Sequence, residues 1–289
     1  MNKSFGFTLF LFCLGFMACD DYFNGLNSGF RIRFSDGTIF HEKDIEFYDT
    51  SSHMIFLKDE IHVSKDVKDF DVLVGRENIY HGVVFPSYMS SMPTETVFIS
   101  DIDLNDNAII HLNSYTFQED FRNDPRIINA LRKSNKIHYG LDCTIDKIEV
   151  SASGDHSAVN CTITVKNNDN FSYYIIDPMK MGNIDFNYYT GGLFFNNMET
   201  KVSSFLIWSS PNPDYNNLTM DDFSILKGGQ KVQYTFYSDD YYKMEPGIYN
   251  ASFRFAGYRE YFNTSDLVKP NGTIWVGSLY STLNGIVVN

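Results

Sequence analysis

The chain has 289 residues, of which 43% are hydrophobic and 20% are charged, and its formal net charge is −13. This much apolar material is enough for folded cores and argues against a chain that is disordered throughout. The acidic charge repels phosphate backbones and argues against nucleic-acid binding. The length fits two domains, and the 26 Phe and 19 Tyr residues favour β structure, because aromatic side chains suit pleated, half-buried surfaces.

Residues 1–18 are expected to be a signal peptide. Lys3 gives a positive start, and the apolar run over residues 5–17 is shorter than the roughly 20 residues that span a bilayer. The run ends Phe16-Met17-Ala18-Cys19, which resembles the lipobox of bacterial lipoproteins. The resemblance implies cleavage before Cys19 and acylation of that cysteine, which would anchor the mature protein to a membrane. An ordinary secretory signal with an incidental cysteine is the alternative.

The lipidation site is followed at once by Asp20 and Asp21, and residues 19–29 are expected to form a lipidated tether. The acidic pair resembles the surface-export signal of Bacteroidetes lipoproteins, and the whole chain looks like uncharacterised Bacteroidetes-type lipoproteins. The resemblance implies an outer-membrane protein that faces the cell exterior, but it supplies no function. In enterobacteria the same aspartate would imply retention at the inner membrane.

An N-terminal β domain is expected over residues 30–117. Apolar residues alternate with polar ones over residues 30–34, and Asp36-Gly37 then supplies a turn. A second alternating run at residues 70–74 and its return at residues 79–85 predict a hairpin with a longer loop.

Within this domain, Asp101, Asp103 and Asn105 place oxygen atoms at alternate positions, as calcium-binding loops do. The sixth position of such a loop would be Asp106 where glycine is needed, and the twelfth would be Leu112 where a bidentate glutamate is needed. A polar turn between two strands is therefore the favoured interpretation, and a metal site is the alternative.

Residues 118–139 are expected to contain a short helix that links the domains. Asp124 suits the N-cap position and Pro125 the first helical position. An apolar stripe follows at Ile127, Ile128 and Leu131.

The C-terminal domain is expected over residues 140–289. Apolar residues alternate with polar ones at residues 159–165, 232–236 and 249–255. This pattern predicts strands with one solvent-exposed face, as in an antiparallel sandwich. The order of strands around Leu226-Lys-Gly-Gly and Pro246-Gly-Ile-Tyr249 resembles the immunoglobulin-like accessory domain of deuterolysin-type proteases and small bacterial proteinase-inhibitor domains. The resemblance implies a fold but no activity. The fold class is therefore all-β, with two β-sandwich-like domains joined by a short helix.

Two cysteines, Cys143 and Cys161, remain after the signal peptide and the lipidated residue are set aside. Export permits a disulfide between them. However, counting back from the turn at Gly154-Asp155 places Cys161 opposite Ile148 in a hairpin. A disulfide and two buried thiols both remain open.

No catalytic or cofactor motif is found. The seven histidines show no pair at the spacing of a zinc hydrolase, and the chain has no Gly-x-Ser-x-Gly and no phosphate-binding glycine loop. No cofactor is therefore expected. Aromatic residues near predicted loops could form a flat platform for a sugar, and the candidates are Trp208, Tyr215 and Trp275.

These features favour a lipid-anchored, non-catalytic surface protein that binds a protein or a glycan. A proteinase-inhibitor-like or protease-accessory module is the first alternative. A glycan-binding lipoprotein is the second, and a hydrolase with an unrecognised site is the third.

Overall fold

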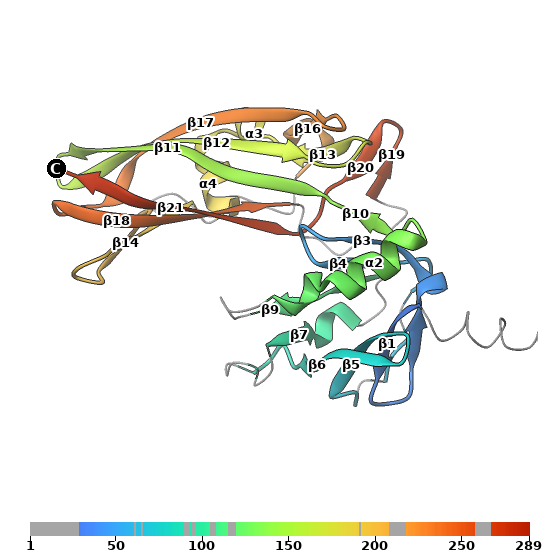
Figure 1. Cartoon of the computed structure of the whole chain (residues 1–289). Coiled ribbons are helices and arrows are strands. Elements are labelled where there is room, and N and C mark those ends of the chain that lie inside the picture. The colour runs from blue at the N-terminus through green and yellow to red at the C-terminus, as the bar shows by residue number, and fades with distance from the viewer. Residues whose placement is uncertain are drawn as a thin grey trace, which may run out of the picture. The chain divides into compact units, whose positions relative to one another are not determined.

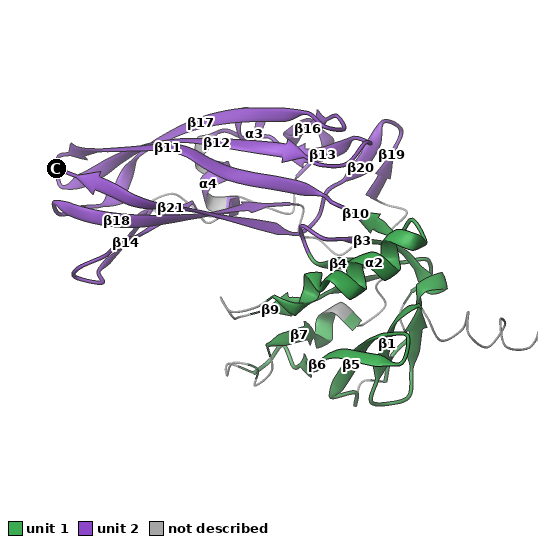
Figure 2. Ribbon diagram, in the orientation of Figure 1, with its two compact units in different colours: residues 1–48, 53–137 green, residues 49–52, 138–289 purple. Residues whose placement is uncertain are grey.

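The computed structural model describes residues 29–60, 62–64, 66–89, 93, 96–104, 108–114, 120–190, 192–207, 218–257 and 267–289. The chain forms two compact units (Figure 2). Unit 1 comprises residues 1–48 and 53–137, and unit 2 comprises residues 49–52 and 138–289. No helix in these described ranges has the length and hydropathy needed to cross a bilayer.

Unit 1 is built mainly from short strands (Figure 1). One sheet has the order β2-β1-β5-β6-β7-β9 and another has the order β10-β3-β4-β8. The strands of the first sheet are β1 (Phe30–Phe34), β2 (Ile39–His41), β5 (Asp69–Val74), β6 (Glu77–Phe85), β7 (Val97–Ser100) and β9 (Asn113–Ser114). Those of the second are β3 (Ile45–Asp49), β4 (Met54–Leu57), β8 (Ile109–His111) and β10 (Ile137–His138). Short 3-10 helices lie at η1 (Glu42–Asp44), η2 (Asp101–Leu104) and η3 (Phe121–Asn123).

The alternating runs of unit 1 form the strands that they predict. Strand β1 buries Phe30, Ile32 and Phe34, and β5 pairs with β6 as an antiparallel hairpin. Phe70 faces Gly82 in this hairpin, and a Cβ atom at position 82 would lie 2.3 Å from Cζ of Phe70. The absence of a side chain at Gly82 therefore lets the Phe70 ring lie across the neighbouring strand.

The predicted helix is α2 (Pro125–Lys133), and Asp124 caps it by accepting a hydrogen bond from the backbone N–H of Arg126. The helix is not a separate linker. Ile127 and Leu131 belong to the hydrophobic core of unit 1 together with residues of both sheets. The apolar stripe that identified the helix also packs it into the N-terminal unit.

Unit 2 is built from layered sheets, so both units are rich in strands and the all-β, sandwich-like fold class is confirmed. One layer has the order β11-β12-β17, with strands β11 (Leu141–Ser153), β12 (His156–Asn167) and β17 (Lys231–Tyr242). A second has the order β15-β14-β18-β21, with strands β14 (Leu193–Asn197), β15 (Ser203–Phe205), β18 (Gly247–Ala256) and β21 (Ser278–Val288). A third has the order β16-β13-β20-β19, with strands β13 (Tyr173–Ile176), β16 (Phe223–Leu226), β19 (Val268–Lys269) and β20 (Gly272–Ile274). The turn helix η5 (Met220–Asp222) precedes β16.

Helices α3 (Pro178–Met181) and α4 (Asn183–Thr190) interrupt the strands of unit 2, and α4 lies between its two long layers (Figure 1). The fully buried ring of Phe186 on α4 lies 5.8 Å from that of Phe236 on β17 and 6.2 Å from that of Phe253 on β18, measured between ring centroids. One side chain therefore fills the space between both layers.

The cysteines of unit 2 lie in the register that the sequence predicts. Cys161 pairs with Ile148, and Cys143 pairs with Val165 further along the same hairpin. Both are buried free thiols. Burial raises the pKa of each thiol to about 12, which suppresses the reactive thiolate.

Candidate functional site

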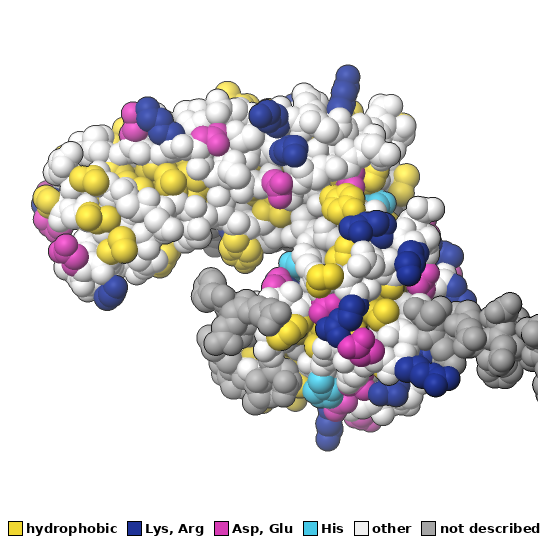
Figure 3. Space-filling view, viewed as in Figure 1, with side chains coloured by type: hydrophobic (Ala, Val, Ile, Leu, Met, Phe, Trp, Pro, Cys, Tyr) yellow, Lys and Arg dark blue, Asp and Glu magenta, His cyan; other side chains and the backbone are white. Residues whose placement is uncertain are grey.

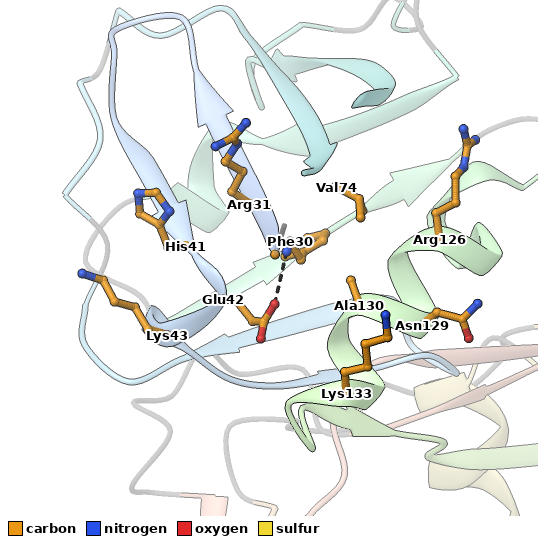
Figure 4. Close-up of a pocket in the computed structure, with 11 residues that line it drawn as sticks. Phe30, Arg31, His41, Glu42, Lys43, Val74, Arg126, Asn129, Ala130 and Lys133 are labelled. Carbon is orange, nitrogen blue, oxygen red and sulfur yellow. Dashed lines mark hydrogen bonds between the residues drawn. The ribbon is translucent and has the colours of Figure 1, made fainter. Parts of the chain in front are cut away.

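A cavity with a volume of about 590 Å³ lies in unit 1 (Figure 4). This volume falls within the range of about 300–1,000 Å³ that is usual for small-molecule sites. The cavity lies between the start of β1, the helix η1 and the exposed face of α2. Its lining comprises Gly29, Phe30, Arg31, His41, Glu42, Lys43, Val74, Arg126, Asn129, Ala130 and Lys133.

Local structure explains how α2 lines the cavity. Arg126, Asn129 and Lys133 are spaced by three and four residues, so they share one face of the helix. The opposite face buries Ile127 and Leu131 in the core. Packing of α2 in unit 1 therefore fixes which polar side chains reach the cavity.

Glu42 and Lys133 point into the cavity from opposite sides, with Phe30 and Ala130 between them (Figure 4). The backbone N–H of Phe30 donates a hydrogen bond of 3.2 Å to Oε2 of Glu42. Gly29 makes room for this carboxylate, because a Cβ atom there would lie 2.8 Å from the same oxygen. The start of the folded body therefore holds Glu42 in place.

The cations of the lining differ in how far their charge is neutralised. Arg126 donates to both oxygens of Asp124, at 2.8 Å and 2.7 Å, and also contacts Glu77. The hydrogen bond from Arg126 lowers the pKa of Asp124 and raises that of Arg126. Arg31 instead donates to the backbone oxygen of Gly75 at 2.6 Å. Lys and Arg side chains lie interspersed with Asp and Glu side chains on the visible face of unit 1 (Figure 3).

The lining has the composition of a ligand site. None of its residues is Ser, Thr, Cys or Tyr, so among the described residues it offers no hydroxyl or thiol nucleophile. Glu42 is its only carboxylate, whereas glycoside hydrolysis uses two. What the lining does offer is an apolar wall with a few convergent charged and amide groups, which is the usual composition of a ligand site.

A second group of titratable side chains lies elsewhere in unit 1, with Tyr48 buried and Asp120 exposed. The hydroxyl of Tyr48 lies 3.1 Å from Nδ1 of His53 and donates to the backbone oxygen of Arg122 at 3.0 Å. Nε2 of His53 lies 3.5 Å from Oδ2 of Asp120, which also accepts a hydrogen bond from Arg122 at 2.8 Å. Burial acts to raise the pKa of Asp120, but the hydrogen bond and charge of Arg122 hold it below its usual value. This group ties η3 to the second sheet.

Several residues singled out in the sequence lie outside the described residues, namely Cys19, Asp20, Asp21, Asn105, Trp208 and Tyr215. The side chain of Asp103 is also outside them. Asp101 begins η2, and its Oδ1 accepts a hydrogen bond of 2.8 Å from the backbone N–H of Ser87. In the described part of the chain, no three His, Cys, Asp or Glu side chains gather as metal ligands would.

The prediction that Trp275 forms part of a sugar platform is wrong. Only 1% of this side chain is exposed, because it packs in the core of unit 2, where its ring centroid lies 6.3 Å from that of Phe255. A platform needs a ring with one open face.

Exposed rings of unit 2 instead gather on β14, β15 and β17. Phe194 and Phe205 face each other across paired strands with parallel rings, and the ring of Tyr242 lies 5.0 Å from that of Phe205. Each of the three side chains is at least 40% exposed. Strand alternation in β14 carries the signal for this set, because Phe195 points inward and Phe194 outward.

Comparison with known proteins finds no matching family model and no matching curated sequence. The assignment of function therefore depends on the N-terminal sequence and on the chemistry of the cavity.

Proposed function

We propose that this protein is a lipid-anchored, non-catalytic binding module of the outer membrane that faces the cell exterior. The signal peptide, the lipobox ending at Cys19 and the acidic pair Asp20 and Asp21 support the anchoring and the location. The cavity of unit 1 supports the binding role, because in this proposal it is the site that a small ligand occupies.

The observation that carries the binding role is the composition of the cavity. Phe30, Val74 and Ala130 provide an apolar wall, and charged side chains surround it without a hydroxyl or thiol group. Such a lining holds and orients a ligand but lacks the paired groups that nucleophilic or glycosidic catalysis requires.

The exposed rings of Phe194, Phe205 and Tyr242 favour a second candidate function, which is glycan binding on unit 2. Open aromatic faces stack on the apolar faces of sugar rings, and this set takes the place of the buried Trp275. In this alternative, changing Phe205 and Tyr242 to alanine abolishes retention on a glycan array.

Surface labelling of intact cells tests the proposed location. The parent protein is expected to react with a membrane-impermeant amine reagent on whole cells. The double variant Asp20→Ala/Asp21→Ala is expected to remain lipidated but to react only after lysis, because the export signal is lost. Glu199→Ala/Asp239→Ala, on the body of unit 2, is the control and should behave as the parent. A parent protein that reacts only after lysis would overturn the surface location.

A further inference from the structure

We propose that the cavity of unit 1 binds a tetrahedral anionic group, a phosphate or sulfate ester, carried on a small hydroxylated skeleton. The inference rests on the proposed function, because it names the ligand class of the same cavity. It follows from the juxtaposition of unneutralised cations on β1, η1 and α2 around one apolar wall.

The charge of the lining determines the class of ligand. Arg126 is neutralised by its carboxylate partners. Arg31 donates only to a backbone oxygen, and Lys43 and Lys133 have no carboxylate within 4 Å among the described residues. Arg31, Lys43 and Lys133 therefore stand against the single carboxylate Glu42, so this part of the lining carries an excess of positive charge. A phosphate monoester carries about −1.5 to −2 at neutral pH, so it matches this excess.

The formal net charge of the whole chain is −13, so the charge of this cavity is opposite in sign to that of the protein as a whole. An acidic surface repels anions in general. Cations that line the cavity have to supply the attraction, and charge-assisted hydrogen bonds from Arg and Lys supply it at short range.

The remaining lining suits the skeleton of the ligand. The wall of Phe30, Val74 and Ala130 accepts an apolar carbon face. Oε2 of Glu42 is held by Phe30, and the described residues offer no partner to Oε1. That oxygen can accept a hydrogen bond from a hydroxyl group of the ligand. Oδ1 of Asn129 accepts a hydrogen bond of 3.0 Å from Arg132, so Asn129 offers its Nδ2 donor at the other edge of the cavity (Figure 4). An anion on a carbon chain with hydroxyl groups uses all of these features.

Two sources can present this chemistry. Gly29 lines the cavity, and the proposed lipidation site at Cys19 is ten residues earlier. Ten extended residues span at most about 36 Å. The cavity can therefore reach a phosphorylated lipid headgroup, and it is also open to a soluble sugar phosphate or sulfate.

The test uses the full chain purified in a neutral detergent that carries no sugar. Isothermal titration calorimetry at low salt compares glucose 6-phosphate with glucose and glycerol 3-phosphate with glycerol. We expect at least one phosphate to bind ten times more tightly than its neutral partner and to weaken as salt is added. Tighter binding of glucose 6-phosphate points to a sugar source, and tighter binding of glycerol 3-phosphate points to a headgroup.

Variants assign the binding to the cavity. Lys133→Gln and Lys43→Gln are each expected to weaken binding of the preferred phosphate about tenfold, because each removes a charge-assisted hydrogen bond. Lys68→Gln is the matched control, because Lys68 is an exposed lysine of unit 1 outside the lining. Its affinity should equal that of the parent.

The outcomes separate the inference from the proposed function. If glucose and glucose 6-phosphate bind equally well, the proposal of an anionic ligand is overturned. If Val74→Asp also abolishes that binding, the cavity is still a ligand site. Phosphate binding that survives in the double variant Lys43→Gln/Lys133→Gln would also overturn the anionic ligand. If none of the four probes binds, the proposal of an anionic ligand is overturned. The proposed location of the protein at the cell surface would still be tested by surface labelling of intact cells.

Discussion

The indole Nε1–H of Trp275 donates a hydrogen bond of 3.2 Å to Oδ2 of Asp49, although 226 positions separate the two residues in the sequence. Oδ1 of the same carboxylate accepts from the backbone N–H and the hydroxyl of Ser51, at 2.8 Å and 2.6 Å, and from the backbone N–H of Ser52 at 3.1 Å. Asp49 is only 2% exposed, and its burial raises its pKa. This set of bonds fixes residues 49–52 in unit 2.

Replacing Asp49 with alanine is expected to lower the free energy of unfolding by about 2–4 kcal/mol, because it leaves several buried donors without an acceptor. Trp275→Phe removes one of these donors and replaces the buried indole with a smaller ring, so a loss of about 2–4 kcal/mol is expected. Urea unfolding measures both. Asp155→Ala, in the exposed turn between β11 and β12, is the control. Equal stability of Asp49→Ala and this control would contradict the role of the carboxylate.

Removing the Phe186 ring is expected to destabilise unit 2 by about 3–5 kcal/mol, because Phe186→Ala leaves a cavity between two sheets that cannot close. Phe194→Ala is the matched control, since its ring is 40% exposed, and it should cost less than about 1 kcal/mol. Thermal unfolding monitored by near-ultraviolet circular dichroism compares them. Similar losses in the two variants would show that α4 does not hold the layers together.

Stability is expected to fall in mild acid because of two histidines of unit 1. Burial lowers the pKa of His53 to about 3 and that of His111 to about 4, from 6.5 in the unfolded chain. The unfolded state therefore binds more protons than the folded state below pH 6.5. The free energy of unfolding should fall by about 1 kcal/mol per pH unit for each histidine as the pH drops from 6.5 towards 4.

The double variant His53→Asn/His111→Gln checks this pH dependence. Asparagine suits position 53, where φ is 56°. Urea unfolding at pH 7.5 and pH 5.0 should show a smaller difference for the variant than for the parent. A parent protein with equal stability at both pH values would contradict the burial of neutral imidazoles.

The thiols of Cys143 and Cys161 are expected to resist alkylation in the folded protein, because burial raises their pKa values to about 12. Mass spectrometry after treatment with iodoacetamide at pH 8, without a reductant, should show neither thiol modified in buffer and both modified in 8 M urea. Absence of modification in urea would reveal a disulfide between them.

The strands and the capped helix could be predicted because their signals are local. Alternation at Phe30, Ile32 and Phe34 follows from the two faces of a strand, and Asp124 is a helix cap that depends only on its neighbours. The pairing of Cys161 with Ile148 followed from counting across one turn.

The insertion of residues 49–52 into unit 2 could not be read in the same way. It depends on the hydrogen bond from Trp275 to Asp49, which joins positions 226 residues apart and leaves no local pattern in the sequence. The cavity was missed for a related reason. Arg126, Asn129 and Lys133 share a helix face that the sequence shows, but Glu42 and Arg31 join them only in the folded unit.

Metabolic labelling with a palmitate analogue tests the central claim, which is that acyl chains at Cys19 anchor this body to a membrane. The parent and the control variant Cys143→Ser should both carry the label and sediment with membranes. Cys19→Ser should lose the label and appear as the unprocessed precursor. Equal labelling of Cys19→Ser and the parent would contradict the claim.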